Sequence, residues 1–216
     1  QIDGIFQNQQ EIDNWDNGFL QDNPQPGDVM FSDTNGDGEV TPEDKTSIGN
    51  PHPDARIGFG INFDYNGFDF SLSGKGAFGH QIMKSYRSFS DNEYHNYTTD
   101  ILDKRWHGEG TSNSFPRLTA GNGTNRINVS EIYVEDGDYV KIQNVSLGYD
   151  FKELMPDLPL GQARLYVAGR NVLTFTDYSG MDPEVGYGDD EGWVSGIDLG
   201  FYPSPRTFLM GLNLKF

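Results

Sequence analysis

The sequence predicts an all-β chain whose strands belong to a transmembrane antiparallel β-barrel. Three observations point to this fold class. Apolar and polar residues alternate along several segments of about ten residues, aromatic residues make up 13% of the chain, and glycine accounts for 27 of its 216 residues. Hydrophobic residues reach only 35%, which fits strands with apolar side chains at every second position and polar loops between them.

The clearest strands form a hairpin. Residues 56–66, RIGFGINFDYN, alternate strictly, and Asn66-Gly67 then provides the strongest short hairpin signal. The return strand is FDFSLSGKGAF, residues 68–78, in which Gly74 and Gly76 fall on the apolar face and leave it thin. Because each strand has about ten residues, both are long enough to cross a membrane when tilted.

Three more strands follow, so we expect about five barrel strands in total. YVKIQNVSLGYDF, residues 139–151, changes the phase of its alternation near Gln143, which predicts a bulge or a strand whose upper end packs differently. ARLYVAGRNVLTFTD, residues 163–177, alternates as well. The last segment, TFLMGLNLKF, alternates through to Phe216, and a terminal aromatic residue of this kind is typical of outer-membrane barrels.

The connections between these strands are alternately short and long. Short turns face the periplasm in outer-membrane barrels, whereas long loops face outward. Asn66-Gly67 and residues 152–162 are therefore predicted to be periplasmic, as is the C-terminus, and residues 80–138 and 177–205 are predicted to be extracellular. Aromatic residues at both strand ends agree with two interfacial belts. They are Tyr65, Phe68, Tyr149, Phe151 and Phe216 at the periplasmic ends, and Phe59, Phe78, Phe175 and Phe208 toward the outer ends.

The sequence divides into an extracellular loop region, residues 1–55, and the barrel strands with their loops, residues 56–216. The loop region contains DTNGDGEVTPED, residues 33–44, whose spacing of oxygen-bearing side chains is that of a calcium-binding loop. Proline and glycine on both sides exclude the flanking helices of a calcium sensor, so we expect a structural ion, and the alternative is an Asx-rich turn without metal. The candidate ligands are Asp33, Asn35 and Asp37 through side-chain oxygens, Glu39 through its carbonyl, and Asp44, which closes the shell.

Composition excludes several functions. With 15 Lys and Arg against 33 Asp and Glu, the net charge is −18, and a chain this acidic repels nucleic acid. The chain has no cysteine, and its four histidines lack the spacing of a catalytic metal site. No nucleophile elbow or phosphate-binding loop occurs, so no catalytic residue is predicted and the protein is not expected to be an enzyme. A soluble, secreted, calcium-dependent β-sheet module that binds carbohydrate is the alternative to the barrel.

The motifs together resemble the C-terminal part of the SusC/RagA-type TonB-dependent transporters of Bacteroidetes outer membranes. Each motif is weak alone, but the set is specific in this order and spacing. The matching segments are GIFQNQQEI, PGDVMFSDTNGDGEVTPEDKTSIGNPHPDARIGFGINFDYNGFDFSL, RWHGEGTSNSFPRL, YVEDGDYVKIQNVSLGYDF, ARLYVAGRNVLTFTDYSGMDPE and YPSPRTFLMGLNLKF.

This resemblance implies a plugged barrel of about 22 strands that is energised through TonB and imports oligosaccharides or peptides together with a SusD-like surface lipoprotein. The chain would then be one piece of the transporter, since about five strands cannot close a barrel and an open edge in lipid leaves backbone groups unpaired. The expected partners are the plug and the remaining barrel strands, the lipoprotein, outer-membrane lipid, the imported ligand, and TonB through the N-terminal part that this sequence lacks.

Overall fold

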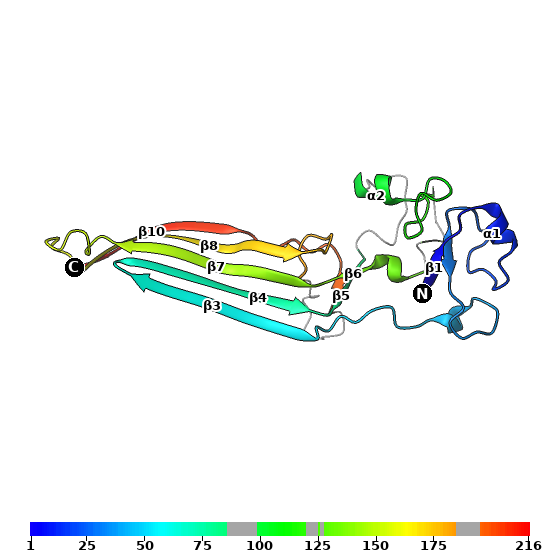
Figure 1. Cartoon of the computed structure of the whole chain (residues 1–216), viewed down its shortest axis with the longest axis horizontal. Helices are drawn as coiled ribbons and strands as arrows, with labels where there is room; N and C mark the ends of the chain where they lie inside the picture. Colours follow the sequence, from blue (N-terminus) through cyan, green and yellow to red (C-terminus); the bar gives the residue numbers. More distant parts are fainter. Residues whose placement is uncertain (86–98, 120–124, 126–127, 185–194) are drawn as a thin grey trace. The chain divides into compact units, whose positions relative to one another are not determined.

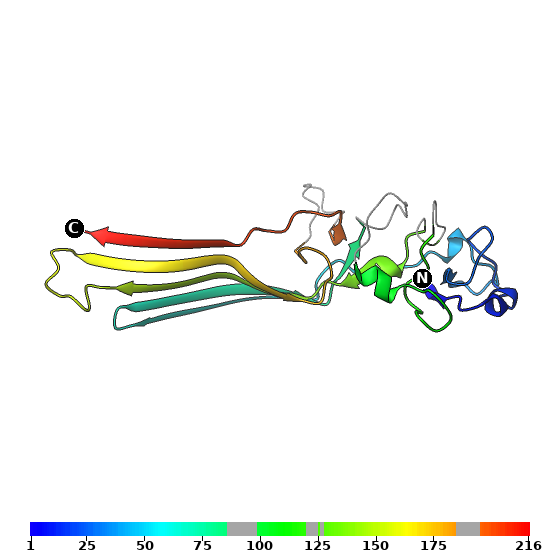
Figure 2. The ribbon, with the colours of Figure 1, turned by 90° about the horizontal axis from the view of Figure 1, so that it is seen from above.

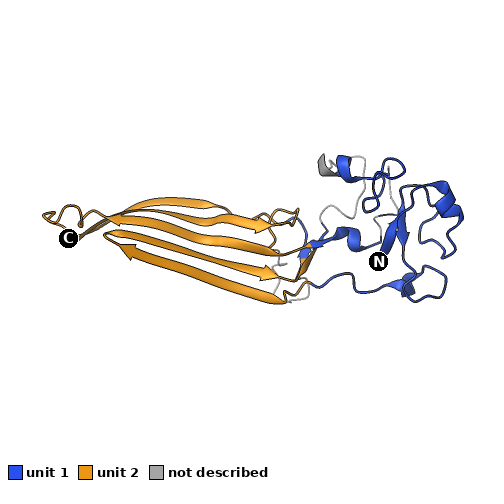
Figure 3. Ribbon diagram, viewed as in Figure 1, with its two compact units in different colours: residues 1–50, 83–135, 197–200 blue, residues 51–82, 136–196, 201–216 orange. Residues whose placement is uncertain are grey.

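The computed structural model describes residues 1–85, 99–119, 125, 128–184 and 195–216. Parts of the predicted loops 80–138 and 177–205 therefore lie outside the described residues. Within the described part, no helix has both the length and the apolar character needed to cross a membrane. The chain forms two compact units (Figure 3). Unit 1 comprises Gln1–Asn50, Met83–Glu135 and Ile197–Gly200, and unit 2 comprises Pro51–Ile82, Asp136–Gly196 and Phe201–Phe216.

Unit 2 is built on one antiparallel sheet of five strands, in the order β10-β8-β7-β4-β3 (Figure 1). The five strands predicted from alternation are confirmed. The sheet does not close on itself, because β3 and β10 each lie at an edge. The strands are β3 (Ala55–Tyr65), β4 (Phe68–Phe78), β7 (Tyr139–Asp150), β8 (Gln162–Thr176) and β10 (Thr207–Lys215).

The structure contains the predicted turn between β3 and β4 and the predicted bulge in β7. Asn66 and Gly67 have φ angles of 45° and 82°, so both central residues of the β3–β4 turn lie in the left-handed region that a type I′ turn requires. The register of β7 against β4 shifts by one residue at Gln143, because Ser73 pairs with Asn144 whereas Gly74 pairs with Ile142. This bulge explains the change of phase, since one extra residue returns the apolar side chains to the same face of the sheet.

The two faces of this sheet differ in chemistry. One apolar row crosses all five strands through Phe63, Phe70, Leu147, Val167 and Met210. Phe63 is 56% exposed and Met210 is 77% exposed, so this row is not the core of the chain.

The opposite face carries hydrogen bonds and ion pairs between strands. Ser71 and Ser146 lie 3.1 Å apart through their hydroxyl oxygens, and Arg164 Nε donates to Asp69 Oδ1 at 2.7 Å. The β3–β4 and β7–β8 connections and the C-terminus all lie at one end of the sheet (Figure 2). The longer connections leave from the other end.

Unit 1 has a small core of its own. Strands β1 (Ile2–Ile5) and β2 (Val29–Phe31) pair in antiparallel fashion, and Ile5, Val29, Phe31 and Val40 are buried together. The short helix α1 (Gln9–Asp13) begins at Asn8, whose side chain accepts a hydrogen bond from the Glu11 N–H.

A buried carboxylate joins distant segments of unit 1. Asp28 is 2% exposed and accepts hydrogen bonds from Arg117 Nε at 2.6 Å and Asn125 Nδ2 at 2.8 Å. The contacts therefore group residues 83–135 with residues 1–50. The remaining elements are η1 (Pro42–Asp44), β5 (Gln81–Lys84), α2 (Thr99–Lys104), η2 (Glu131–Tyr133), β6 (Val134–Asp136) and β9 (Ile197–Asp198).

Candidate functional site

The calcium-type loop, residues 33–44, follows β2 closely and ends in η1. Its side chains fold back on its own backbone. The Gly36 and Gly38 N–H groups donate to the two carboxylate oxygens of Asp33 at 2.6 and 2.8 Å, and the Glu39 N–H donates to Asp37 Oδ1 at 2.9 Å. Gly36 and Gly38 have φ angles of 77° and 88°, which glycine adopts without steric cost.

Asp44 closes this loop from its far end. Its carboxylate accepts hydrogen bonds from the N–H groups of Thr41 at 2.7 Å, Thr34 at 2.8 Å and Asn35 at 3.2 Å. The hydrogen bond from the Thr41 backbone, with further ones from Thr34 and Asn35, holds the pKa of Asp44 below its ordinary value. Asp44 is therefore ionised and ties the two ends of the loop together.

Val40 attaches the loop to unit 1. Its side chain is 7% exposed and belongs to the core cluster, and its N–H donates to the Asn17 carbonyl oxygen at 2.5 Å. Val40 therefore anchors the loop in the core of unit 1. Asp37 and Glu39 are exposed, Asp33 is half-buried and Asp44 is buried.

The predicted ligands are only partly brought together. Asn35 Nδ2 donates to Asp37 Oδ2 at 3.0 Å, so these two side chains meet. Among the described residues, no group of three or more histidine, aspartate or glutamate side chains is arranged to hold a metal ion. The calcium ligand set of Asp33, Asn35, Asp37, Glu39 and Asp44 stays a prediction.

A second cluster lies in unit 2, where the chain leaves β8. Residues 177–184, called the strap below, carry Asp182 and Glu184 against the polar face of the sheet. Glu184 Oε2 accepts from Lys141 Nζ at 2.5 Å and Glu184 Oε1 accepts from the Tyr139 hydroxyl at 3.3 Å. The same Oε1 forms an ion pair with Lys75 Nζ.

Lys141 is the buried centre of this cluster, with a side chain that is 2% exposed. Its Nζ lies 3.3 Å from Asp182 Oδ2 in addition to its contact with Glu184. Burial raises the pKa of Glu184, but the hydrogen bonds from Lys141 and Lys75 and their charges outweigh burial, so that the pKa lies below its ordinary value. The cluster therefore places two lysine side chains against two acidic side chains.

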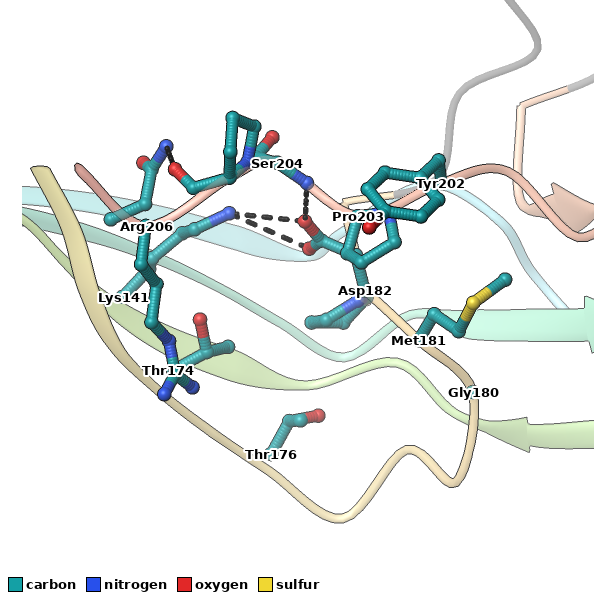
Figure 4. A pocket seen from close by; sticks show the side chains of 13 residues that line it. Lys141, Thr174, Thr176, Gly180, Met181, Asp182, Tyr202, Pro203, Ser204 and Arg206 are labelled. Carbon is teal, nitrogen blue, oxygen red and sulfur yellow. Dashed lines mark hydrogen bonds and ion pairs between the residues drawn. The ribbon is translucent and has the colours of Figure 1, made fainter.

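A hollow of about 590 Å³ lies beside the strap (Figure 4). Asp182 also accepts the Ser204 N–H at 3.2 Å, which joins the strap to residues 202–206 on the other side of the hollow. Tyr202 is 90% exposed, and Asn171 Nδ2 donates to the Pro205 carbonyl oxygen at 3.2 Å. The hollow is lined by Lys141, Asn171, Thr174, Thr176, Gly180, Met181, Asp182, Pro183, Tyr202, Pro203, Ser204, Pro205 and Arg206.

Sequence reasoning missed this cluster. The register pairs Lys75 with Lys141 across β4 and β7, so two cations lie side by side on one face. The alternation places Lys75 on the polar face, but no spacing in the sequence indicates that Glu184, 43 residues after Lys141, provides the charge between them.

Known proteins resemble the chain over most of its length. No protein-family model matches it. TonB-dependent receptor P3 of Formosa agariphila is 37% identical over 202 residues, which cover 91% of this chain and 20% of the receptor. TonB-dependent receptor SusC of Bacteroides thetaiotaomicron is 27% identical over 90% of this chain and 18% of its own length. This chain belongs to the SusC/RagA-type TonB-dependent receptors.

The solved structures agree on the fold of this receptor chain. The RagAB peptide importer in its closed-closed state matches 83% of the chain and 19% of its own chain, with a TM-score of 0.63 and 20% identity. The chain spans about a fifth of the length of the receptors that it matches. TonB-dependent receptors are outer-membrane proteins, and the open antiparallel sheet corresponds to a segment of such a barrel.

Proposed function

We propose that this chain is the C-terminal wall segment, with its outer loops, of a SusC-like importer that takes up glycans or peptides across the outer membrane. The observation that carries the proposal is the five-stranded sheet with one exposed apolar face and two open edges. An apolar face of this size is stable against lipid but not against water. The open edges of β3 and β10 would pair with the remaining strands of the receptor.

The proposal extends to partners and orientation. A SusD-like lipoprotein would cover the outer loops, and the plug and the TonB contact would belong to the rest of the receptor. RagAB, a relative in fold, is described as a peptide importer, which supports an import function without fixing the cargo. The two short connections and the C-terminus share one end of the sheet, which supports a periplasmic position for that end. No catalytic function is proposed.

We also propose that residues 33–44 bind one structural calcium ion in an extracellular loop. Two observations support it. Asp33, Asn35 and Asp37 lie in one short, glycine-containing turn, in which Asn35 contacts Asp37 and the Asp33 carboxylate accepts the Gly36 and Gly38 N–H groups, and Val40 fixes the loop to a folded unit. The exposed carboxylates repel one another, and a divalent cation would remove that repulsion.

The test of the main proposal uses the intact receptor in its own cells. This chain contains no cysteine, so once any cysteine in the rest of the receptor is replaced, single cysteines at Asp37 and at Asn66 report on orientation through a membrane-impermeant maleimide. We expect the receptor to fractionate with the outer membrane and to need detergent for release. Asp37→Cys should react on whole cells, and Asn66→Cys only after the outer membrane is permeabilised. A protein released without detergent would instead favour the secreted carbohydrate-binding module, and equal labelling of both sites would contradict the orientation.

A further inference from the structure

The strap, residues 177–184, contacts the sheet through the charged side chains of Asp182 and Glu184. Two of its side chains are buried, Tyr178, which is 5% exposed, and Pro183. Met181 is 49% exposed. Segments that bury few apolar side chains belong to the least stable parts of a fold and open most readily. The ion pairs of Asp182 and Glu184 are therefore the attachments of the strap that a change of charge would remove.

Glu184 is the point at which these attachments converge. Its two carboxylate oxygens form an ion pair with Lys75 of β4 and accept hydrogen bonds from Tyr139 and Lys141 of β7. A carboxylate that satisfies three donors fixes one position, because a shift in any direction breaks a charge-assisted hydrogen bond. The lysines also need Glu184, since Lys75 and Lys141 are directly paired and their like charges would otherwise repel each other.

Asp182 connects the sheet to the segment around Ser204. It accepts from Lys141 on the sheet and from the Ser204 N–H beyond the hollow, and its Oδ1 accepts the Glu184 N–H at 3.1 Å. Figure 4 shows Asp182 between Lys141 and Ser204, at the rim of the hollow. When the strap lies on the sheet, Gly180–Pro183 form one wall of that hollow.

We propose that Glu184 and Asp182 form an ionic latch that holds the strap closed on the polar face of the sheet and thereby sets the shape of the hollow. Removing one partner of a buried ion pair is costly, because the other charge, here that of the buried Lys141, is left without compensation. The strap is then a small gate on the wall. When Glu184 loses its charge, Lys141 is left without one of its two partners and the strap detaches, while the strands remain paired.

Hydrogen exchange followed by mass spectrometry on the intact, detergent-solubilised receptor tests the latch. In Glu184→Gln we expect backbone amides of residues 177–184 and 201–206 to exchange at least about tenfold faster than in the wild type. Amides of residues 56–78 should be unchanged. Asp69→Asn is the matched control, because it removes another ion pair of the same face, that with Arg164, and should leave the strap as protected as in the wild type.

Two results would overturn the proposal. One is equal exchange of the strap in Glu184→Gln and wild type, and the other is equal acceleration in Asp69→Asn, which would indicate general loosening of the sheet. If Glu184→Gln does not assemble, Lys75→Met replaces it, because Lys75 is 40% exposed and its loss leaves Lys141 paired. In that variant we expect a smaller acceleration confined to the strap, and no change would equally overturn the latch.

Discussion

At the scale of single residues, the thin part of the apolar face has a packing reason. The sequence places Gly74 among apolar positions of β4, where a side chain would be expected. In the structure Gly74 pairs with Phe59 of β3, and a Cβ atom at Gly74 would collide with the Phe59 ring and lie 2.6 Å from the Lys141 carbonyl oxygen. Phe59 thus covers the backbone that the glycine leaves bare, an arrangement known to stabilise glycine in sheets.

Gly74→Ala should therefore destabilise the wall, although alanine is otherwise acceptable in a strand. We expect a loss of about 1–3 kcal/mol, the usual cost of an added group in a filled space, visible as a lower midpoint in urea unfolding of the purified receptor. Gly58→Ala on β3 is the control, because no atom lies within 4 Å of a Cβ built there. If the two variants unfold at the same urea concentration, Phe59 does not pack on Gly74 as described.

At the scale of elements, alternation was sufficient to predict the strands because each strand of this sheet has one apolar and one polar face. The Asn66-Gly67 turn and the bulge at Gln143 could also be predicted, because each depends on a few neighbouring residues. The contacts of Asp28 with Arg117 and Asn125 join positions 89 and 97 residues apart. No local pattern records such pairs, so unit 1 and the latch could not be predicted from sequence.

The calcium-type loop, residues 33–44, can be tested by a single substitution that changes metal content. Asp37→Ala removes one of the proposed oxygen ligands, and we expect the purified receptor to lose about one calcium ion per molecule relative to wild type. Elemental analysis after extensive dialysis measures this. Glu43→Ala is the matched control, because it removes an exposed carboxylate of the same loop that is outside the ligand set. Equal calcium content in wild type and Asp37→Ala would rule out the site.

At the scale of the whole molecule, the open sheet needs partners for its two edge strands and more strands to close a barrel, and this chain provides neither by itself. The outer edges of β3 and β10 carry backbone N–H and C=O groups with no neighbouring strand among the described residues, and lipid offers them no hydrogen-bond partner. The sheet is also only a small arc, because a plugged transporter barrel has about 22 strands. Both requirements are met if the rest of the receptor continues the sheet from each edge.

The residue after β10 provides a test of how the sheet meets the membrane interface. Phe216 is 94% exposed and follows β10 directly, at the end of the sheet shared with the short connections, where an aromatic side chain would sit at the membrane interface. Deleting Phe216 should lower the amount of folded receptor in the outer membrane several-fold, since modest losses of stability change abundance by that much. Phe216→Tyr keeps an aromatic ring at this position and should assemble at the wild-type level. Quantitative immunoblots of outer-membrane fractions, with heat-modifiable mobility to distinguish folded barrels, measure both variants. Unchanged levels of folded receptor after the deletion would show that the terminal aromatic residue does not contribute to assembly.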